Sequence, residues 1–186
     1  MNKVILMCLC MIIGTTGVFS QEFALDKGSL LITGTGSFST SGGDLYKSAD
    51  NKRLNSIAVI PSVNYFIYPN VFAGLGFAYD RTSQGDASAT TIGVGPRVGY
   101  VNGDKDSKVL PFFDWGVDYN SSKIDDQTIS GLSVVIGGGV IVLGSENMGL
   151  VVEATWNVAE MKAKDADSPE TGNAVTIGIG IAGFIF

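Results

Sequence analysis

Histidine is absent from this 186-residue chain, and its two cysteines, Cys8 and Cys10, both lie in the first ten residues. Histidine is the usual general base and the commonest metal ligand, so its absence excludes most nucleophile systems and classical zinc sites. Export with loss of the first residues would also remove every cysteine, and with them disulfides and thiolates. We therefore expect no catalytic, metal-binding or cofactor-binding residues, and no enzymatic activity.

Basic residues are scarce as well. The chain has 12 lysines and arginines against 18 aspartates and glutamates. Beyond residue 20, where Lys3 no longer counts, 11 basic residues face 18 acidic ones, a formal net charge of −7. Nucleic acids select positive surfaces, so we expect no nucleic-acid partner.

The first 20 residues have the pattern of a cleavable signal peptide. Lys3 supplies a positive charge, the ten residues from Val4 to Ile13 form an apolar run, and Val18-Phe19-Ser20 offers a cleavage site. As a helix this run would span only about 15 Å, against about 30 Å for the hydrocarbon core of a bilayer. We therefore expect residues 1–20 to be a signal peptide for export and residues 21–186 to form one domain.

Long hydrophobic runs are missing from the rest of the chain, although 45% of all residues are hydrophobic and the mean hydropathy is positive. The longest run, Val134 to Leu143, is interrupted by three glycines. A membrane-spanning chain without apolar helices has one other solution, because every backbone donor and acceptor needs a partner inside the bilayer. That solution is a closed β-barrel.

From Ser29 onward, eight segments show alternation with a period of two, which predicts strands. They lie near residues 29–39, 56–67, 71–80, 90–101, 109–119, 130–143, 149–158 and 174–186. In the fifth, one face has large apolar side chains and the other has aspartate and glycine (Phe113, Trp115, Val117 and Tyr119 against Asp114, Gly116 and Asp118). This pattern predicts an all-β fold, an eight-stranded antiparallel up-and-down barrel.

The apolar face is expected to point outward. Eight strands leave an interior that small side chains and a few charges can fill, whereas a soluble ligand carrier would turn its large apolar residues into a cavity. Aromatic residues near the strand ends fit the interfacial girdles of transmembrane barrels (Tyr65, Tyr68, Tyr79, Tyr100, Phe113 and Tyr119). A transmembrane barrel is therefore the interpretation that we prefer.

The expected connections alternate in length along the chain. Long segments at about 40–55, 81–89, 120–129 and 159–173 alternate with short ones at 68–70, 102–108 and 144–148. Outer-membrane barrels have short periplasmic turns and longer external loops. The alternation predicts four external loops, with both chain ends on the periplasmic side.

Three motifs carry a resemblance to a known family. They are the hairpin from Asn64 to Gly76, the strand from Gly93 to Tyr100, and the terminal Phe184-Ile185-Phe186. With these motifs the chain resembles the outer-membrane protein β-barrel domain family, which includes the small OmpA-like and OmpX-like barrels. The resemblance covers essentially the whole segment after residue 20. It implies the outer membrane of a Gram-negative bacterium, with Phe184 and Phe186 as a signal for the barrel assembly machinery.

The last strand departs from a single alternation. Its large aliphatic residues, from Val175 to Ile181, share a parity that excludes Phe184 and Phe186. A β-bulge near Ala182-Gly183 would place both sets against lipid, since glycine is a usual bulge residue.

Four charged residues share the inward parity of three expected strands: Arg97, Asp114, Asp118 and Glu153. An arginine on the lipid face would cost about 2–4 kcal/mol near the midplane, so inward placement is cheaper. Such a set could gate a narrow pore, but a structural ion network that plugs the lumen is the interpretation that we favour.

Three functions remain open from the sequence. The first is a monomeric structural or surface-interaction scaffold in the outer membrane, whose external loops contact partners and whose wall contacts lipid and lipopolysaccharide. The second is a porin-like narrow channel for ions or small solutes through the polar lumen. The third is a soluble periplasmic barrel that binds a ligand.

Overall fold

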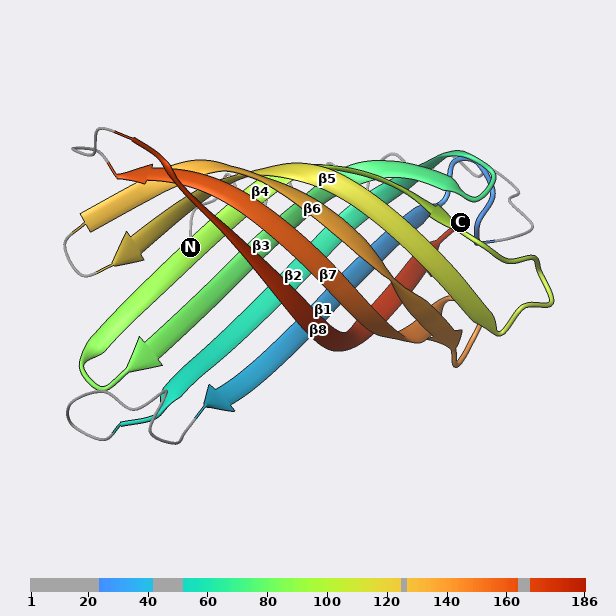
Figure 1. Ribbon diagram of the computed structural model, residues 1–186. Coiled ribbons are helices and arrows are strands. Elements are labelled where there is room, and N and C mark those ends of the chain that lie inside the picture. Colours follow the sequence, from blue (N-terminus) through green and yellow to red (C-terminus); the bar gives the residue numbers. More distant parts are fainter. Residues whose placement is uncertain (1–23, 42–51, 125–126, 164–167) are drawn as a thin grey trace, which may run out of the picture.

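The alternating residues form eight antiparallel strands that close on themselves. In the computed structural model, residues 24–41, 52–124, 127–163 and 168–186 are described. The strands are β1 (Leu30–Ser41), β2 (Leu54–Tyr68), β3 (Val71–Gln84), β4 (Ala87–Val101), β5 (Val109–Ile124), β6 (Gln127–Leu143), β7 (Met148–Ala163) and β8 (Glu170–Ile185). Each strand pairs with the next, and β8 pairs with β1 (Figure 1). The expected signal peptide, residues 1–20, lies outside the described residues.

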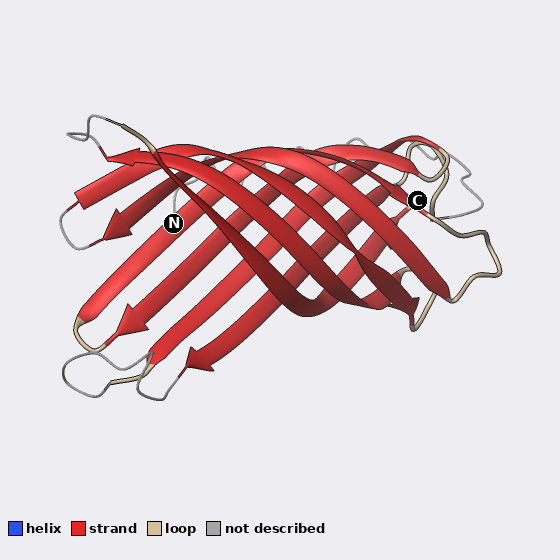
Figure 2. Cartoon of the chain, viewed as in Figure 1, coloured by secondary structure: helices blue, strands red, loops and turns tan. Residues whose placement is uncertain are grey.

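All regular structure in the described residues is strand (Figure 2). Within this part of the chain, no helix is long and apolar enough to cross a membrane. Residues 24–29 and the last residue, Phe186, lie at one end of the barrel, together with the connections 69–70, 102–108 and 144–147 (Figure 1). We call this end the terminal end. At the opposite end, the distal end, β1, β3, β5 and β7 finish and β2, β4, β6 and β8 begin.

The prediction that long and short connections alternate is wrong. At the distal end, β3 and β4 are joined by residues 85–86 alone, and β5 and β6 by residues 125–126. Their strands continue pairing to the turn, as Gln84 with Ala87 and Ile124 with Gln127 show. Two of the four connections expected to be long therefore have only two residues, whereas 42–53 and 164–169 have more.

The bulge expected near Ala182-Gly183 is also absent. The register of β8 against β1 runs without a shift from Ile185 to Ile179, and its register against β7 is unbroken from Gly183 to Glu170. Regular alternation places Phe184 inside the barrel, where it is only 3% exposed. The two parities of β8 thus reflect an apolar layer inside the terminal end, not a change of register.

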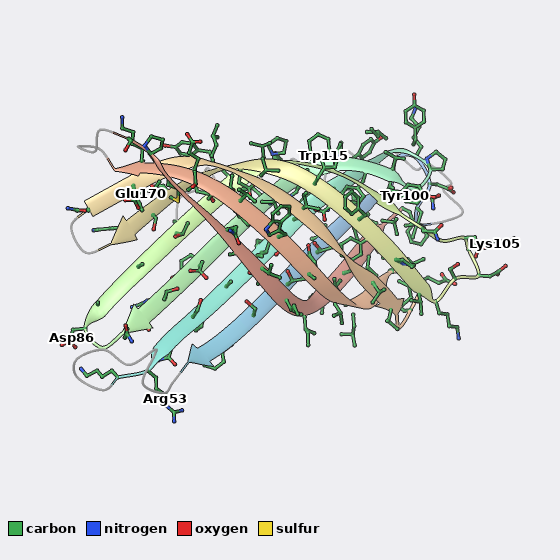
Figure 3. All side chains as sticks on the ribbon, viewed as in Figure 1. Arg53, Asp86, Tyr100, Lys105, Trp115 and Glu170 are labelled. Carbon is green, nitrogen blue, oxygen red and sulfur yellow. The ribbon has the colours of Figure 1, made fainter. Side chains whose placement is uncertain are left out.

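The outer wall is apolar between two polar ends. More than 30 large hydrophobic side chains are exposed there, among them Val134, Trp115, Trp156, Ile177 and all six aromatic residues expected at the girdles. In Figure 3, Trp115 and Tyr100 project outward from the wall, while the labelled charged residues Arg53, Asp86, Glu170 and Lys105 lie at the two ends. A soluble protein rarely exposes apolar area on this scale, so the wall requires a nonpolar surrounding.

The seam between β1 and β8 is shorter than the other ladders. It comprises seven residue pairs, from Leu30 with Ile185 to Gly36 with Ile179. In the described part of the chain, the distal half of β8, Glu170–Gly178, pairs with β7 alone. Figure 1 shows this half of β8 diverging from β1. The barrel wall is therefore least complete at the distal side of this seam.

Candidate functional site

The inward face of the barrel combines glycine with polar and charged side chains. Inward residues alternate with the outward apolar ones along each strand, as the pleat of a β-strand requires. The buried polar and charged residues of the described chain lie on five strands and in the segment before β1: Ser29, Thr35, Asn64, Arg97, Asp114, Asp118, Asn120, Ser122 and Ser133. In the part of the chain that is described, the lumen thus gathers polar groups away from solvent.

Arg97 of β4 is the centre of this polar interior. Its Nη2 donates to Oδ2 of Asp118 at 2.7 Å, and its Nε lies 4.0 Å from Oδ2 of Asp114. Arg97 pairs across the ladder with Gly116, so the two aspartates of β5 flank it on either side. A charge-assisted hydrogen bond of this length is stronger than a neutral one.

Glycines on the neighbouring strands make room for the guanidinium. A Cβ placed at Gly76 of β3 would lie 2.7 Å from Nε of Arg97. A Cβ placed at Gly116 of β5 would collide with Nη1 of Arg97 and with the carbonyl oxygen of Pro96. Glycine at these two positions therefore leaves the space that the Arg97 side chain occupies.

Glu153 of β7 lies apart from the Arg97 ion pairs. Its Oε2 accepts a hydrogen bond from the Thr35 hydroxyl at 3.2 Å, and no salt bridge joins it to a basic group in the described residues. The structure therefore brings Arg97, Asp114 and Asp118 into contact, and it places Glu153 against the same cavity. Sequence reasoning missed Thr35, although its inward parity on β1 was a usable signal.

Further polar residues that sequence reasoning did not single out complete the interior. Asn120 donates from Nδ2 to the Ser133 hydroxyl at 2.8 Å, and Asn157 approaches the same oxygen at 3.4 Å. Asp80 of β3 accepts hydrogen bonds from Ser56 at 3.1 Å and Thr82 at 3.2 Å. These hydrogen bonds give the polar side chains on the distal side of Arg97 their partners.

A cavity of about 270 Å³ lies on the distal side of Arg97. Its walls come from strands β2 to β8, and its charged lining residues are Arg97, Asp80, Asp114, Asp118 and Glu153. A smaller hollow at the β1–β8 seam shares Glu153, Thr155 and Thr176 with this cavity. The polar interior therefore extends from the Arg97 cluster toward the distal end and the open part of the seam.

The terminal end of the lumen is filled by an apolar cluster, which we call the plug. It consists of Ala24, Leu25, Leu31, Phe66, Phe72, Val101, Leu110, Ile141, Val151, Ala182 and Phe184. Phe66, Leu110, Val101 and Val151 have no exposed surface, and the rings of Phe66 and Phe72 meet edge to face at 6.0 Å. Side chains from all eight strands thus close this end to water.

The segment before β1 adds to the plug. The backbone N–H of Asn70 donates to the carbonyl of Leu25 at 2.9 Å, and that of Gly28 donates to Phe66 at 2.8 Å. Leu25 is thereby held against the plug with no exposed surface. Residues 24–29 thus reinforce the closure of the terminal end.

The two phenylalanines of the expected assembly signal differ in environment. Phe184 is buried in the plug, whereas Phe186 follows the end of β8 and is 38% exposed. The backbone N–H of Phe184 donates to the carbonyl of Asn147 at 2.8 Å. In the folded barrel, Phe184 thus has a packing role of its own.

A metal ion would need several ligating side chains that converge on one point. In the described ranges, no cluster of three or more histidine, cysteine, aspartate or glutamate side chains is arranged to bind one. What the lumen offers chemically is hydrogen bonding and negative charge.

Comparisons with solved structures match the whole barrel. The outer membrane protein OprG from Pseudomonas aeruginosa aligns with a TM-score of 0.55 at 12% identity, over 88% of this chain and 99% of that one. Neisserial surface protein A aligns with a TM-score of 0.54 at 15% identity, over 83% and 94%. A chain from the de novo design of transmembrane β-barrels aligns with a TM-score of 0.50 at 20% identity, over 86% and 98%.

The chain has the fold of the transmembrane β-barrels. The fold class predicted from the sequence is thereby confirmed, as is the resemblance to small outer-membrane barrels at the level of the fold. No protein-family model and no curated protein sequence matches the chain.

Proposed function

We propose that the protein is an integral barrel of a Gram-negative outer membrane and acts there as a non-catalytic scaffold. The observation that carries the proposal is the continuous apolar exterior of a closed barrel with polar ends. Closure leaves no backbone edge that lipid would have to cover, apart from the distal side of the β1–β8 seam. Two barrels of the same fold are, by their names, an outer membrane protein and a surface protein.

In this proposal the terminal end faces the periplasm and the distal end faces outward. Residues 1–20 serve as the export signal, and residues 21–186 form the barrel domain. The connection of residues 42–53 follows the distal end of β1, and its twelve residues fit the longer external loops of such barrels. Phe184 and Phe186 present the terminal aromatic residues to the assembly machinery, and the monomeric barrel contacts lipid and lipopolysaccharide through its wall.

The plug supports a scaffold over a channel. A conducting pore needs a continuous wet path, whereas Leu25, Phe66 and Leu110 close the terminal end with no exposed surface. The polar side chains line only the part of the lumen beyond that layer. The soluble-carrier alternative fits poorly, because most large apolar residues point outward and the cavity lining includes five charged side chains.

Membrane integration is tested by fractionation together with gel mobility. We expect the protein in the outer-membrane fraction, extractable only with detergent, and we expect it to migrate faster in SDS before boiling than after it. Closed barrels keep their hydrogen-bonded wall in SDS until heated. Recovery in the soluble periplasmic fraction, without a heat-dependent shift, would contradict the proposal.

A further inference from the structure

The lumen cavity has an excess of negative charge. Among its lining residues, four carboxylates, those of Asp80, Asp114, Asp118 and Glu153, face the single guanidinium of Arg97. With all five groups ionised, the lining has a formal charge of −3. Arg97 is already committed to Asp118 and Asp114, while Glu153 and Asp80 accept hydrogen bonds from neutral hydroxyls.

Two of these carboxylates also have buried oxygens that lack a donor. Oδ1 of Asp118 and Oδ1 of Asp114 have no hydrogen-bond partner, although the two residues are only 2% and 9% exposed. Both side chains line the cavity. Burying a polar atom without a hydrogen-bond partner costs free energy. A donor that enters the cavity and bonds to these oxygens would therefore gain more free energy than the same donor gains in water.

We propose that this cavity binds a small organic cation that carries N–H donors, an amine or a guanidinium. The positive charge would offset the acidic excess, and the N–H groups would supply the donors that the aspartate oxygens lack. A cavity of about 270 Å³ admits a molecule of several heavy atoms but is small for a drug-sized ligand. The ligand enters from the distal side, because the plug closes the other end.

This inference goes beyond the proposed scaffold function. Its failure can be distinguished from the failure of that function. A barrel that binds no cation would still fractionate with the outer membrane and shift on heating. A barrel found in the soluble fraction would contradict the scaffold without deciding what the cavity binds.

The test is calorimetric titration of the detergent-solubilised, folded full barrel with three probes. 1,4-Diaminobutane has both charge and N–H donors, tetramethylammonium has charge alone, and 1,4-butanediol is neutral. We expect saturable binding of the diamine and at least tenfold weaker binding of the other two. Equal binding of all three probes, or no saturable binding of the diamine, would overturn the proposal.

Two substitutions locate the binding in the cavity. Glu153→Gln and Asp80→Asn remove one charge each but keep an oxygen that accepts the existing hydroxyl hydrogen bonds. Each is expected to weaken diamine binding about tenfold, which equals about 1.4 kcal/mol. The matched control is Glu160→Gln, an equal charge change on the exposed face of β7 outside the cavity.

The heat-dependent gel shift of each variant verifies that the barrel has folded before titration. Unchanged affinity in both cavity variants, or an equal loss in the Glu160→Gln control, would show that the diamine binds to surface charge and would overturn the proposal.

Discussion

At the scale of single residues, Arg97 pairs with the two most buried carboxylates of the described lumen. Its partners, Asp118 and Asp114, are both buried, and each has a second oxygen without a donor. Taking charges out of water is expensive, and their attraction repays the cost only while both partners are present. The ion network thus allows these charges to be buried in the interior, more than it adds to the net stability of the barrel.

Replacing Arg97 with methionine should leave two buried carboxylates without a cation. We expect the free energy of unfolding in detergent, measured by denaturant titration, to fall by about 3–5 kcal/mol. The double variant Arg97→Met/Asp118→Asn removes one of the stranded charges and should recover a substantial part of this loss. A double variant less stable than Arg97→Met would contradict the network.

Gly116 offers a test of the room that Arg97 needs. A methyl group there would collide with the Pro96 carbonyl and the Arg97 guanidinium, so Gly116→Ala should destabilise the barrel by roughly 1–3 kcal/mol. The matched control is Gly34→Ala, since nothing lies within 4 Å of a Cβ at Gly34. Denaturant titration of both variants would refute the argument if they lost equal stability.

The side chains of this site were only partly predictable from the sequence. Parity gave the inward direction of Arg97, Asp114, Asp118 and Glu153, because strands alternate strictly. Parity does not give the register between strands, and it is the register of Arg97 against Gly116 that places both aspartates beside it. For the same reason, the sequence did not show that Glu153 lies outside the ion pairs of Arg97.

At the scale of elements, the eight strands differ most at the β1–β8 seam. Each paired strand is held from both sides, but the distal half of β8 pairs with β7 alone in the described residues. Backbone groups on the free side lack a strand partner there. Such an edge opens more easily than a central strand.

Hydrogen exchange should reveal this difference within one strand. We expect the amides of Glu170–Gly178 that point toward β1 to exchange at least tenfold faster than those of Ile179–Ile185, which lie in both ladders. The measurement is amide exchange by NMR on the barrel in detergent micelles. Uniform protection along β8 would show that the seam is closed over its full length.

The strand ends at the terminal end were predicted to within one residue, but at the distal end every strand extends two to five residues beyond its predicted limit. Compact turns such as Pro69-Asn70 mark the terminal end, and Asn70 adopts a positive φ of 68° that favours a tight turn. Toward the distal end, β3 and β5 continue with Thr82, Ser83, Ser121 and Ser122. Because polar residues occupy both faces there, the sequence no longer alternates between apolar and polar residues. These strand residues therefore cannot be distinguished from a loop by sequence alone.

The wrong prediction of a bulge in β8 has a different cause. The prediction assumed that every large apolar residue faces outward, so Phe184 required a change of register. An interior that is apolar at one end and polar beyond it violates that assumption. Alternation reports which residues share a face, and only the assembled barrel shows what each level of the interior contains.

At the scale of the whole molecule, the barrel is closed at its terminal end and contains a cavity on the distal side of that closure. The plug closes the terminal end, a polar cavity occupies the lumen beyond it, and an apolar band surrounds both. These parts depend on one another. Because the outward-facing residues of the strands are apolar, charged residues within the band can lie only at inward-facing positions.

The depth of the apolar band can be measured by charge substitution along β6. Val134→Arg places a charge in the middle of this strand, where we expect a cost of about 2–4 kcal/mol in the free energy of unfolding from lipid vesicles. Thr128→Arg lies on the same exposed face near the distal end of β6 and should cost roughly 0–1 kcal/mol. Equal costs at the two positions would contradict a membrane-embedded band.

Whether the plug seals the barrel is the most direct test of the proposed scaffold. The measurement is K⁺ efflux from lipid vesicles, normalised to the amount of heat-shifting, folded barrel that they contain. The wild-type barrel should release K⁺ no faster than protein-free vesicles, whereas Phe66→Ala/Phe72→Ala, which removes the edge-to-face pair of the plug, should release it faster. Rapid efflux through the wild-type barrel would contradict the sealed lumen and favour the narrow channel.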